Sequence, residues 1–161
     1  MDSRRLQIIK GMAAHFEAMN DAVGLSTKWT RVSTSPLTPA DRRMRASLSI
    51  TPASESKKPM VLAGGKGRYD CNLVLRLHWY YLVDKATEPD TLTAAENVLC
   101  EVQKWVDRAN DSGQPLSGLA RGILEVNNEV RQDNENDIQI EGVLLVVCAY
   151  SHLQGDPTQA K

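Results

Sequence analysis

Hydrophobic positions recur at helical spacing in two parts of the chain. In residues 3–23 they return every three or four positions, and Gly24 follows where a C-terminal cap is expected. A second stripe of this kind runs through residues 92–110, after Asp90 or Thr91, either of which can cap a helix N-terminus. The pattern predicts two amphipathic helices, each with one face available for a core.

Other segments alternate between apolar and polar residues, as half-buried strands do. The clearest alternation covers residues 70–84, and two further segments at 121–131 and 138–151 flank a polar connection, which is typical of an antiparallel hairpin. Residues 25–34 and 47–51 are rich in β-branched side chains and are also predicted to be short strands.

Residues 52–68 carry two prolines, three glycines and no apolar period, which predicts a long flexible loop, and residues 152–161 are expected to form a loose C-terminal tail. The remaining elements predict an α+β fold: one domain over residues 1–161, with an antiparallel or mixed β-sheet of about four to five strands and two main helices packed on one face.

Composition narrows the class of protein. The 161 residues are 42% hydrophobic and carry a net charge of -1, which argues against a nucleic-acid coat or a polybasic membrane anchor. No run approaches membrane-spanning length, and the N-terminus lacks the apolar segment of a signal peptide. Three widely spaced cysteines, Cys71, Cys100 and Cys148, lie in apolar runs, so we expect a reducing compartment, the cytosol, and buried, unreactive thiols.

No pattern of catalytic or ligand-binding residues emerges. The glycine-rich residues 63–68 lack the spacing and the flanking strand and helix of a phosphate loop. The three histidines have no zinc-ligand spacing, and no serine lies in a nucleophile elbow. Carboxylates such as Glu101 fall on the polar side of the second helix, where solvation explains them. The sequence therefore predicts no catalytic, cofactor or metal site, and a protein that is not an enzyme.

Charge is distributed unevenly along the chain. The middle of the chain is basic, through Arg42, Arg43, Arg45, Lys57, Lys58, Lys66 and Arg68. The last hairpin is acidic, through Glu125, Glu129, Asp133, Glu135, Asp137 and Glu141. Separated patches of opposite sign suit head-to-tail contacts between identical subunits, and unrelated solvated loops are the alternative interpretation.

The order of elements resembles that of the tail terminator, or tail completion, proteins of long-tailed bacteriophages, the group that includes minor tail protein U. The resemblance lies in the N-terminal segment RRLQIIKGMAAHFEAM, the strand ending LRLHWYYLVDK, the helix TLTAAENVLCEVQKWV and the closing pair GILEVNNEVRQDNENDIQIEGVLLVVCAYSHLQGDP. It covers nearly the whole chain as a pattern of elements, and residues 36–67 are its least typical part.

This resemblance implies a structural virion protein of the tail neck, assembled in the host cytoplasm without a cofactor. Such proteins form a ring, typically a homohexamer, on the end of the tail tube, stop its polymerisation and offer a surface to the head connector. The expected partners are other copies of the chain, the tube protein and the connector, with no membrane partner; contact with DNA in the lumen stays open. We expect the basic residues above to be contact residues, with the acidic set as their counter-surface.

Two alternatives remain at this stage. A different head-tail joining protein of the neck would share the size and the sheet. A small cytosolic ligand-binding module or enzyme would need a site assembled from residues that lie far apart in the sequence.

Overall fold

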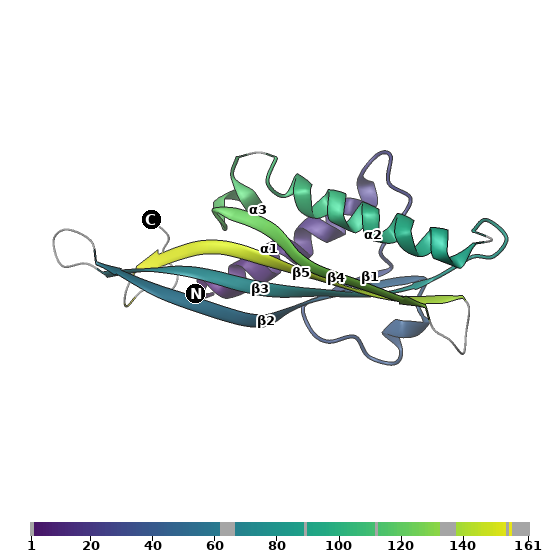
Figure 1. The fold of residues 1–161 in the computed structure, drawn as a ribbon, viewed down its shortest axis with the longest axis horizontal. Coiled ribbons are helices and arrows are strands. Elements are labelled where there is room, and N and C mark those ends of the chain that lie inside the picture. Colours follow the sequence, from purple (N-terminus) through teal and green to yellow (C-terminus); the bar gives the residue numbers. More distant parts are fainter. Residues whose placement is uncertain are drawn as a thin grey trace.

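The chain folds around one five-stranded mixed sheet with helices on one face (Figure 1). The computed structural model describes residues 2–61, 67–88, 90–111, 113–132, 138–153 and 155. The strands are β1 (Arg31–Ser33), β2 (Ala46–Val61), β3 (Gly67–Leu82), β4 (Gly122–Gln132) and β5 (Gln139–Leu153), in the spatial order β1-β2-β3-β5-β4. β1 pairs with β2 in parallel, and every other pairing is antiparallel. The predicted α+β class is confirmed.

Two long helices cover the sheet: α1 (Arg4–Ala18) and α2 (Thr91–Arg108). Each begins at a polar cap. The Ser3 side chain accepts a hydrogen bond from the Leu6 amide, and the Asp90 side chain accepts one from Leu92. Helix α1 gives way to the 3-10 turn η1 (Met19–Asp21), so the first helical segment is shorter than the sequence indicated.

The core lies between these helices and the inner face of the sheet. β3 contributes every second residue to it, and the side chains that it buries completely are Leu73, Leu75, Leu77 and Trp79. Most of the predicted stripe residues face them, including Met12 and Phe16 of α1 and Val98, Val102 and Val106 of α2. Ile8 is buried with them, whereas Leu6 and Leu92, at the starts of the predicted stripes, are exposed. The period-2 strand and the period-3.6 helices therefore bury the surfaces that their patterns indicated.

His15 and Trp105 join the two helices by two reciprocal hydrogen bonds. The His15 Nε2 atom lies 2.7 Å from the Trp105 carbonyl oxygen, and the Trp105 indole N–H donates to the His15 carbonyl at 2.7 Å. Their rings stack with centroids 4.8 Å apart. Burial lowers the pKa of His15, against a smaller opposing effect of the hydrogen bond to Trp105. The contact fixes α1 against α2 and sets their spacing over the sheet.

The long loop predicted for residues 52–68 is wrong. Residues 46–61 form β2 and residues 67–82 form β3. The two strands pair along their length, and the last pair is Val61 with Gly67. Residues 62–66 lie outside the described part of the chain. β1 pairs with β2 only at residues 47–49, so the rest of β2 is a sheet edge, where proline is tolerated. The loose tail predicted for residues 152–161 begins later than expected, because His152 and Leu153 belong to β5. Residues 154 and 156–161 of this segment lie outside the described residues.

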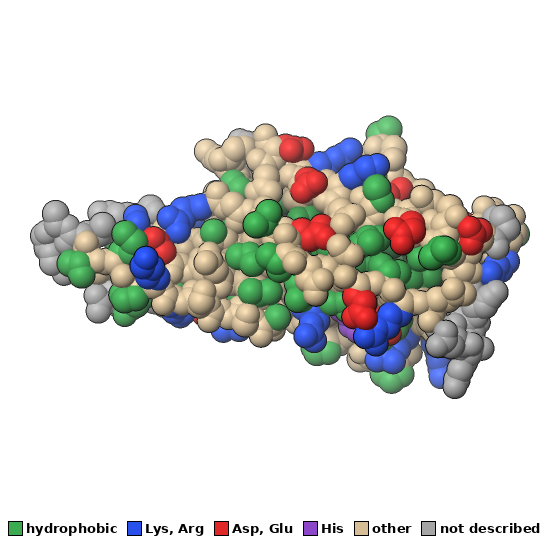
Figure 2. Space-filling view, viewed as in Figure 1, with side chains coloured by type: hydrophobic (Ala, Val, Ile, Leu, Met, Phe, Trp, Pro, Cys, Tyr) green, Lys and Arg blue, Asp and Glu red, His purple; other side chains and the backbone are tan. Residues whose placement is uncertain are grey.

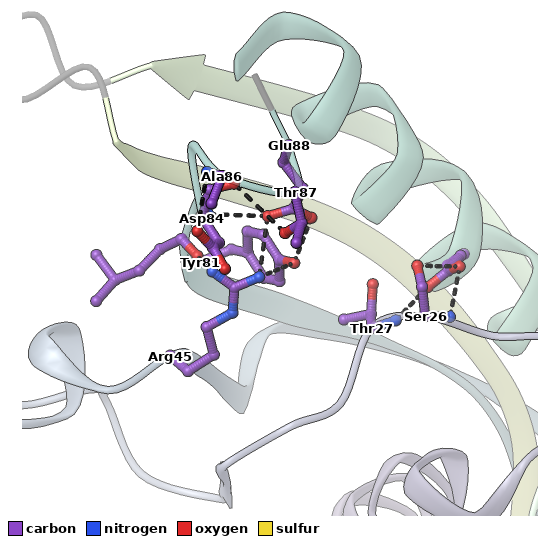
Figure 3. Close-up of polar contacts among 10 residues, drawn as sticks. Ser26, Thr27, Arg45, Tyr81, Asp84, Ala86, Thr87 and Glu88 are labelled. Carbon is purple, nitrogen blue, oxygen red and sulfur yellow. Dashed lines mark hydrogen bonds and ion pairs between the residues drawn. The ribbon is translucent and has the colours of Figure 1, made fainter. Parts of the chain in front are cut away.

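Glu101 and Cys100 of α2 also depart from expectation. Glu101 is partly buried and accepts hydrogen bonds from the Ser26 amide and hydroxyl, each at 2.8 Å, and from the Thr27 amide at 2.7 Å (Figure 3). These hydrogen bonds therefore hold Ser26 and Thr27, which follow α1, against α2. Cys100 is exposed, because it faces away from the buried stripe, whereas Cys71 and Cys148 are buried free thiols.

Replacing Glu101 by Gln should lower the free energy of unfolding by about 1 to 3 kcal/mol at neutral pH, because it weakens charge-assisted hydrogen bonds. Burial alone would raise the pKa of Glu101, but the hydrogen bonds from Ser26 and Thr27 outweigh it and hold the pKa below its ordinary 4.5. The stabilisation is therefore full above the unfolded-state pKa and is lost as pH falls through the folded-state pKa. Urea titrations at several pH values should show the difference from wild type shrinking below the unfolded-state pKa. The exposed Glu96→Gln variant is the control and should change little.

Gly142 and Gly122 provide a matched pair for a second prediction. A Cβ atom at Gly142 would lie 2.1 Å from indole carbons of Trp79, which is fully buried, whereas one at Gly122 would meet nothing within 4 Å. Gly142→Ala should therefore destabilise the fold by about 1 to 3 kcal/mol through overpacking, and Gly122→Ala should not. The unfolding midpoint in urea measures both, and equal midpoints would contradict the packing of Trp79 against β5.

Candidate assembly surfaces

The β2–β3 hairpin reaches beyond the helices. Each of its strands has 16 residues, about 50 Å of extended chain, whereas the 18 residues of α2 span about 27 Å. Figure 1 shows the hairpin projecting from the end of the layered body. We call residues 54–61 with residues 67–72 the arm. Two apolar side chains of the arm are exposed, Met60 at 37% and Val61 at 89%.

Polar contacts at its base hold the arm in the plane of the sheet. The buried Tyr150 hydroxyl of β5 donates a hydrogen bond to Glu55, which also pairs with Lys57 at 3.3 Å. Burial, followed by this hydrogen bond, raises the pKa of Tyr150. On the other face, Asp70 lies 3.2 Å from the Arg68 guanidinium, within ion-pair distance. The arm is therefore a continuation of the sheet with fixed geometry.

The face of the sheet opposite the helices is covered at one end only. There the segment 34–45, which contains the turn η2 (Asp41–Arg43), passes beneath the strands. The Ser47 hydroxyl donates to the Asp41 carbonyl, and the Ser49 hydroxyl donates to the Ser35 carbonyl at 2.8 Å. These contacts explain why two serines of β2 are buried.

The rest of this face carries a group of apolar side chains, with polar ones such as Arg76 and Asn127 beside them. The strand register places Val74, Val147 and Leu124 in one row across β3, β5 and β4, and Leu145 and Val143 in the next two rows. Leu124 is 67% exposed, and the other four are partly buried. We call these five residues the open-face patch. Figure 2 shows hydrophobic side chains gathered over β4 and β5, with acidic side chains beside them.

The structure separates the basic residues that the sequence grouped together. Arg42, Arg43 and Arg45 precede β2, whereas Lys57, Lys58 and Arg68 lie in the arm, and Lys66 is outside the described residues. The strand between residues 46 and 57 is extended, so the two groups are roughly 35 Å apart. They cannot form one continuous surface.

Arg45 forms hydrogen bonds and an ion pair with residues of its own chain (Figure 3). Its guanidinium donates to Glu88 Oε2 and to the Tyr81 hydroxyl, each at 2.9 Å, and lies 4.7 Å from the centre of the Tyr81 ring. The Tyr81 hydroxyl donates to Glu88 Oε1 at 2.7 Å. Burial and this hydrogen bond raise the pKa of Tyr81 to about 12. The geometry gives Arg45 a structural role, closing the turn after β3.

The acidic residues of the last hairpin also have partners in the same chain. Glu141 accepts hydrogen bonds from the Tyr80 hydroxyl at 2.9 Å and pairs with His78 at 2.7 Å, and Arg42 stacks on the Tyr80 ring. Burial would raise the pKa of Glu141, but these hydrogen bonds hold it below its ordinary value. Arg42 and Glu141, which the sequence assigned to opposite contact surfaces, are thus neighbours around Tyr80 in one copy.

Two other acidic residues differ in their surroundings. Glu125 faces α2, where it accepts hydrogen bonds from Gln103 at 3.0 Å. Glu129 is exposed, pairs with Arg131 at 2.6 Å, and lies opposite Val143 in the register, beside the open-face patch. Asp133, Glu135 and Asp137 lie outside the described residues.

Within the described residues, no group of three or more His, Cys, Asp or Glu side chains converges as metal ligands would. A cleft of about 360 Å³ lies between the ends of α1 and α2 and the short turn α3 (Pro115–Gly118), where Leu116 and Ser117 adopt left-handed backbone angles. His15 on its wall is engaged by Trp105. Among the helices of the described segments, none is both long and apolar enough to cross a membrane.

Comparison with known proteins gives likenesses among solved structures only. No family model matches the chain, and no curated protein matches it. Among solved structures, the chain is similar to the sheath/tube terminator of an extracellular contractile injection system, PVC, determined by cryo-EM in its extended state. The two share 15% sequence identity with a TM-score of 0.38, and the match covers 97% of this chain and 60% of the terminator chain.

The different surroundings of Arg45 and Lys58 predict different effects of removing them. Arg45→Ala should lower the free energy of unfolding by about 1 to 3 kcal/mol, because it removes the cationic partner of Glu88 and the guanidinium that lies over the Tyr81 ring. Lys58→Ala, at an exposed position of the arm, should stay within about 0.5 kcal/mol of wild type. Urea unfolding of both variants checks this, and equal losses would contradict a structural role confined to Arg45.

Proposed function

We propose that this protein is a structural tail protein that forms a ring on the end of a long phage tail tube, ends tube polymerisation and provides the surface that joins the tail to the head connector. The observation that carries the proposal is a rigid sheet with one face buried by helices, the other largely open, and an arm that projects beyond the body. A subunit of a ring between two partners needs several distinct surfaces of this kind.

The resemblance to tail terminators in the order of elements supports the same role. So does the chemistry of the exposed parts: an apolar open face suits burial against another protein, and exposed charges in the arm suit steering between subunits. We propose a homohexamer, with the tube protein on one side of the ring and the connector on the other. Arg43, Lys57 and Lys58 are exposed contact candidates, whereas Arg68 is partly buried beside Asp70. DNA in the lumen would meet any of them that line it.

The test adds the purified protein to polymerising tail tube subunits and examines the tubes by negative-stain electron microscopy. We expect tubes that stop growing and carry extra density at one end, because a ring bound there blocks further addition. The variant Lys57→Glu, Lys58→Glu, at two exposed positions of the arm, should fail to cap, whereas Lys104→Glu, at an exposed position of α2, should cap like wild type. Tubes of unchanged length with bare ends in the presence of wild-type protein would overturn the proposed function.

A further inference from the structure

We infer that the arm of one copy packs on the open-face patch of a second copy, with Lys58 against Glu129 and Met60 against Leu145. The inference rests on the proposed function in that it names the contact between neighbours in the ring.

The open-face patch is made of valine and leucine, the composition of a surface that is buried against another protein. Along β5, residues 143–150 are apolar or nearly so on both faces of the sheet, and such continuous runs are typical of strands buried on both faces. A strand with one face in water normally alternates with polar residues. Helices bury one face of β5 in this chain, whereas Val143, Leu145 and Val147 on the other face are only partly buried.

The arm supplies an apolar surface that also lacks a cover. Met60 and Val61 are exposed at its end, although the side chains of the arm could have been entirely polar without loss to the core. Lys58 and Met60 lie on the same face of β2, about 7 Å apart along the strand. On the patch, Glu129 lies in the row of Val143, and Leu145 lies in the next row on the same face, about 7 Å along the strand. Lys58 beside Met60 thus faces Glu129 beside Leu145, and Glu129 gains a second cationic partner in addition to Arg131 of its own copy.

Contact through the free edges of the sheet is disfavoured. The open edge of β2 contains Pro52 and Pro59 and a register shift after Pro52, features that prevent edge-to-edge pairing. At the other edge, the Ile123 amide and carbonyl are already hydrogen bonded to the Asn110 side chain. The two copies therefore meet through side chains on the faces of their sheets.

The contact must join two different copies. The arm and the patch belong to one continuous sheet, because β3 pairs with β5 from Arg68 to Leu82, so the arm cannot fold back onto its own patch. Each copy offers one arm and one patch, and repetition of such a contact closes into a ring when the rotation permits.

A charge-swap experiment tests the pairing of Lys58 with Glu129. Self-association is measured by sedimentation velocity over about a hundredfold range of concentration. Lys58→Glu alone and Glu129→Lys alone should each weaken self-association by about tenfold or more, because like charges then meet. Mixing the two variants should restore it, since each arm finds a patch of opposite charge. Lys104→Glu is the matched control and should associate like wild type.

Cross-linking tests the second pair independently, in a Cys100→Ser background that removes the exposed native thiol. Chains with Met60→Cys, mixed with chains carrying Leu145→Cys, should give a disulfide-linked dimer on mild oxidation. Chains with Met60→Cys mixed with chains carrying Leu92→Cys, an exposed position of α2, should not. Melting curves show that each variant is folded before it is scored.

The outcomes separate this contact from the proposed function. If wild-type protein caps tubes, but the charge swap restores nothing and no cross-link forms, the contact is wrong and the function stands. If the swap and the cross-link succeed but tubes are never capped, the contact stands and the function fails. A wild-type protein that stays monomeric throughout, with no cross-link, overturns the contact.

Discussion

Burial of one face of β3 and β5 beneath α1 and α2 is the interaction on which the rest of the structure depends. Leu75, Leu77 and Trp79 are fully buried there, and every other element is positioned relative to that layer. The reciprocal hydrogen bonds between His15 and Trp105 hold the helices together, and Glu101 attaches the segment that leads to β1. Because the helices are shorter than the strands, this layer covers only part of the sheet.

The uncovered parts of the sheet define what the protein can do. The arm extends past the helices with exposed apolar residues, and the open face of β5 carries valine and leucine where water-facing strands carry polar residues. Neither feature contributes to the core of a single copy. Both are explained if the fold is one unit of a larger assembly, in which the arm and the open face of neighbouring copies cover each other.

Local patterns were enough to predict the helices, the strands β3, β4 and β5 and the fold class, because burial on one face imposes a regular period. They failed for residues 52–61, whose side chains are nearly all exposed on both faces, so no alternation marks the strand. Cys100 has apolar neighbours in sequence but points to the solvent side of its helix. The basic residues that are close in sequence are far apart in the structure, because the extended strand β2 lies between the two groups. The partners of Arg45 and Glu101 come from segments distant in sequence, so no local residue pattern predicts these contacts.

The most direct test of the account is the molar mass of the protein in solution, measured by light scattering across a range of concentrations. We predict a species of about six times the 17.8 kDa chain mass that dissociates on dilution, because the proposed ring contains six copies, each with its arm and its patch covered by neighbours. A mass that stays at one or two chains at every concentration, with and without tail tubes, would contradict it.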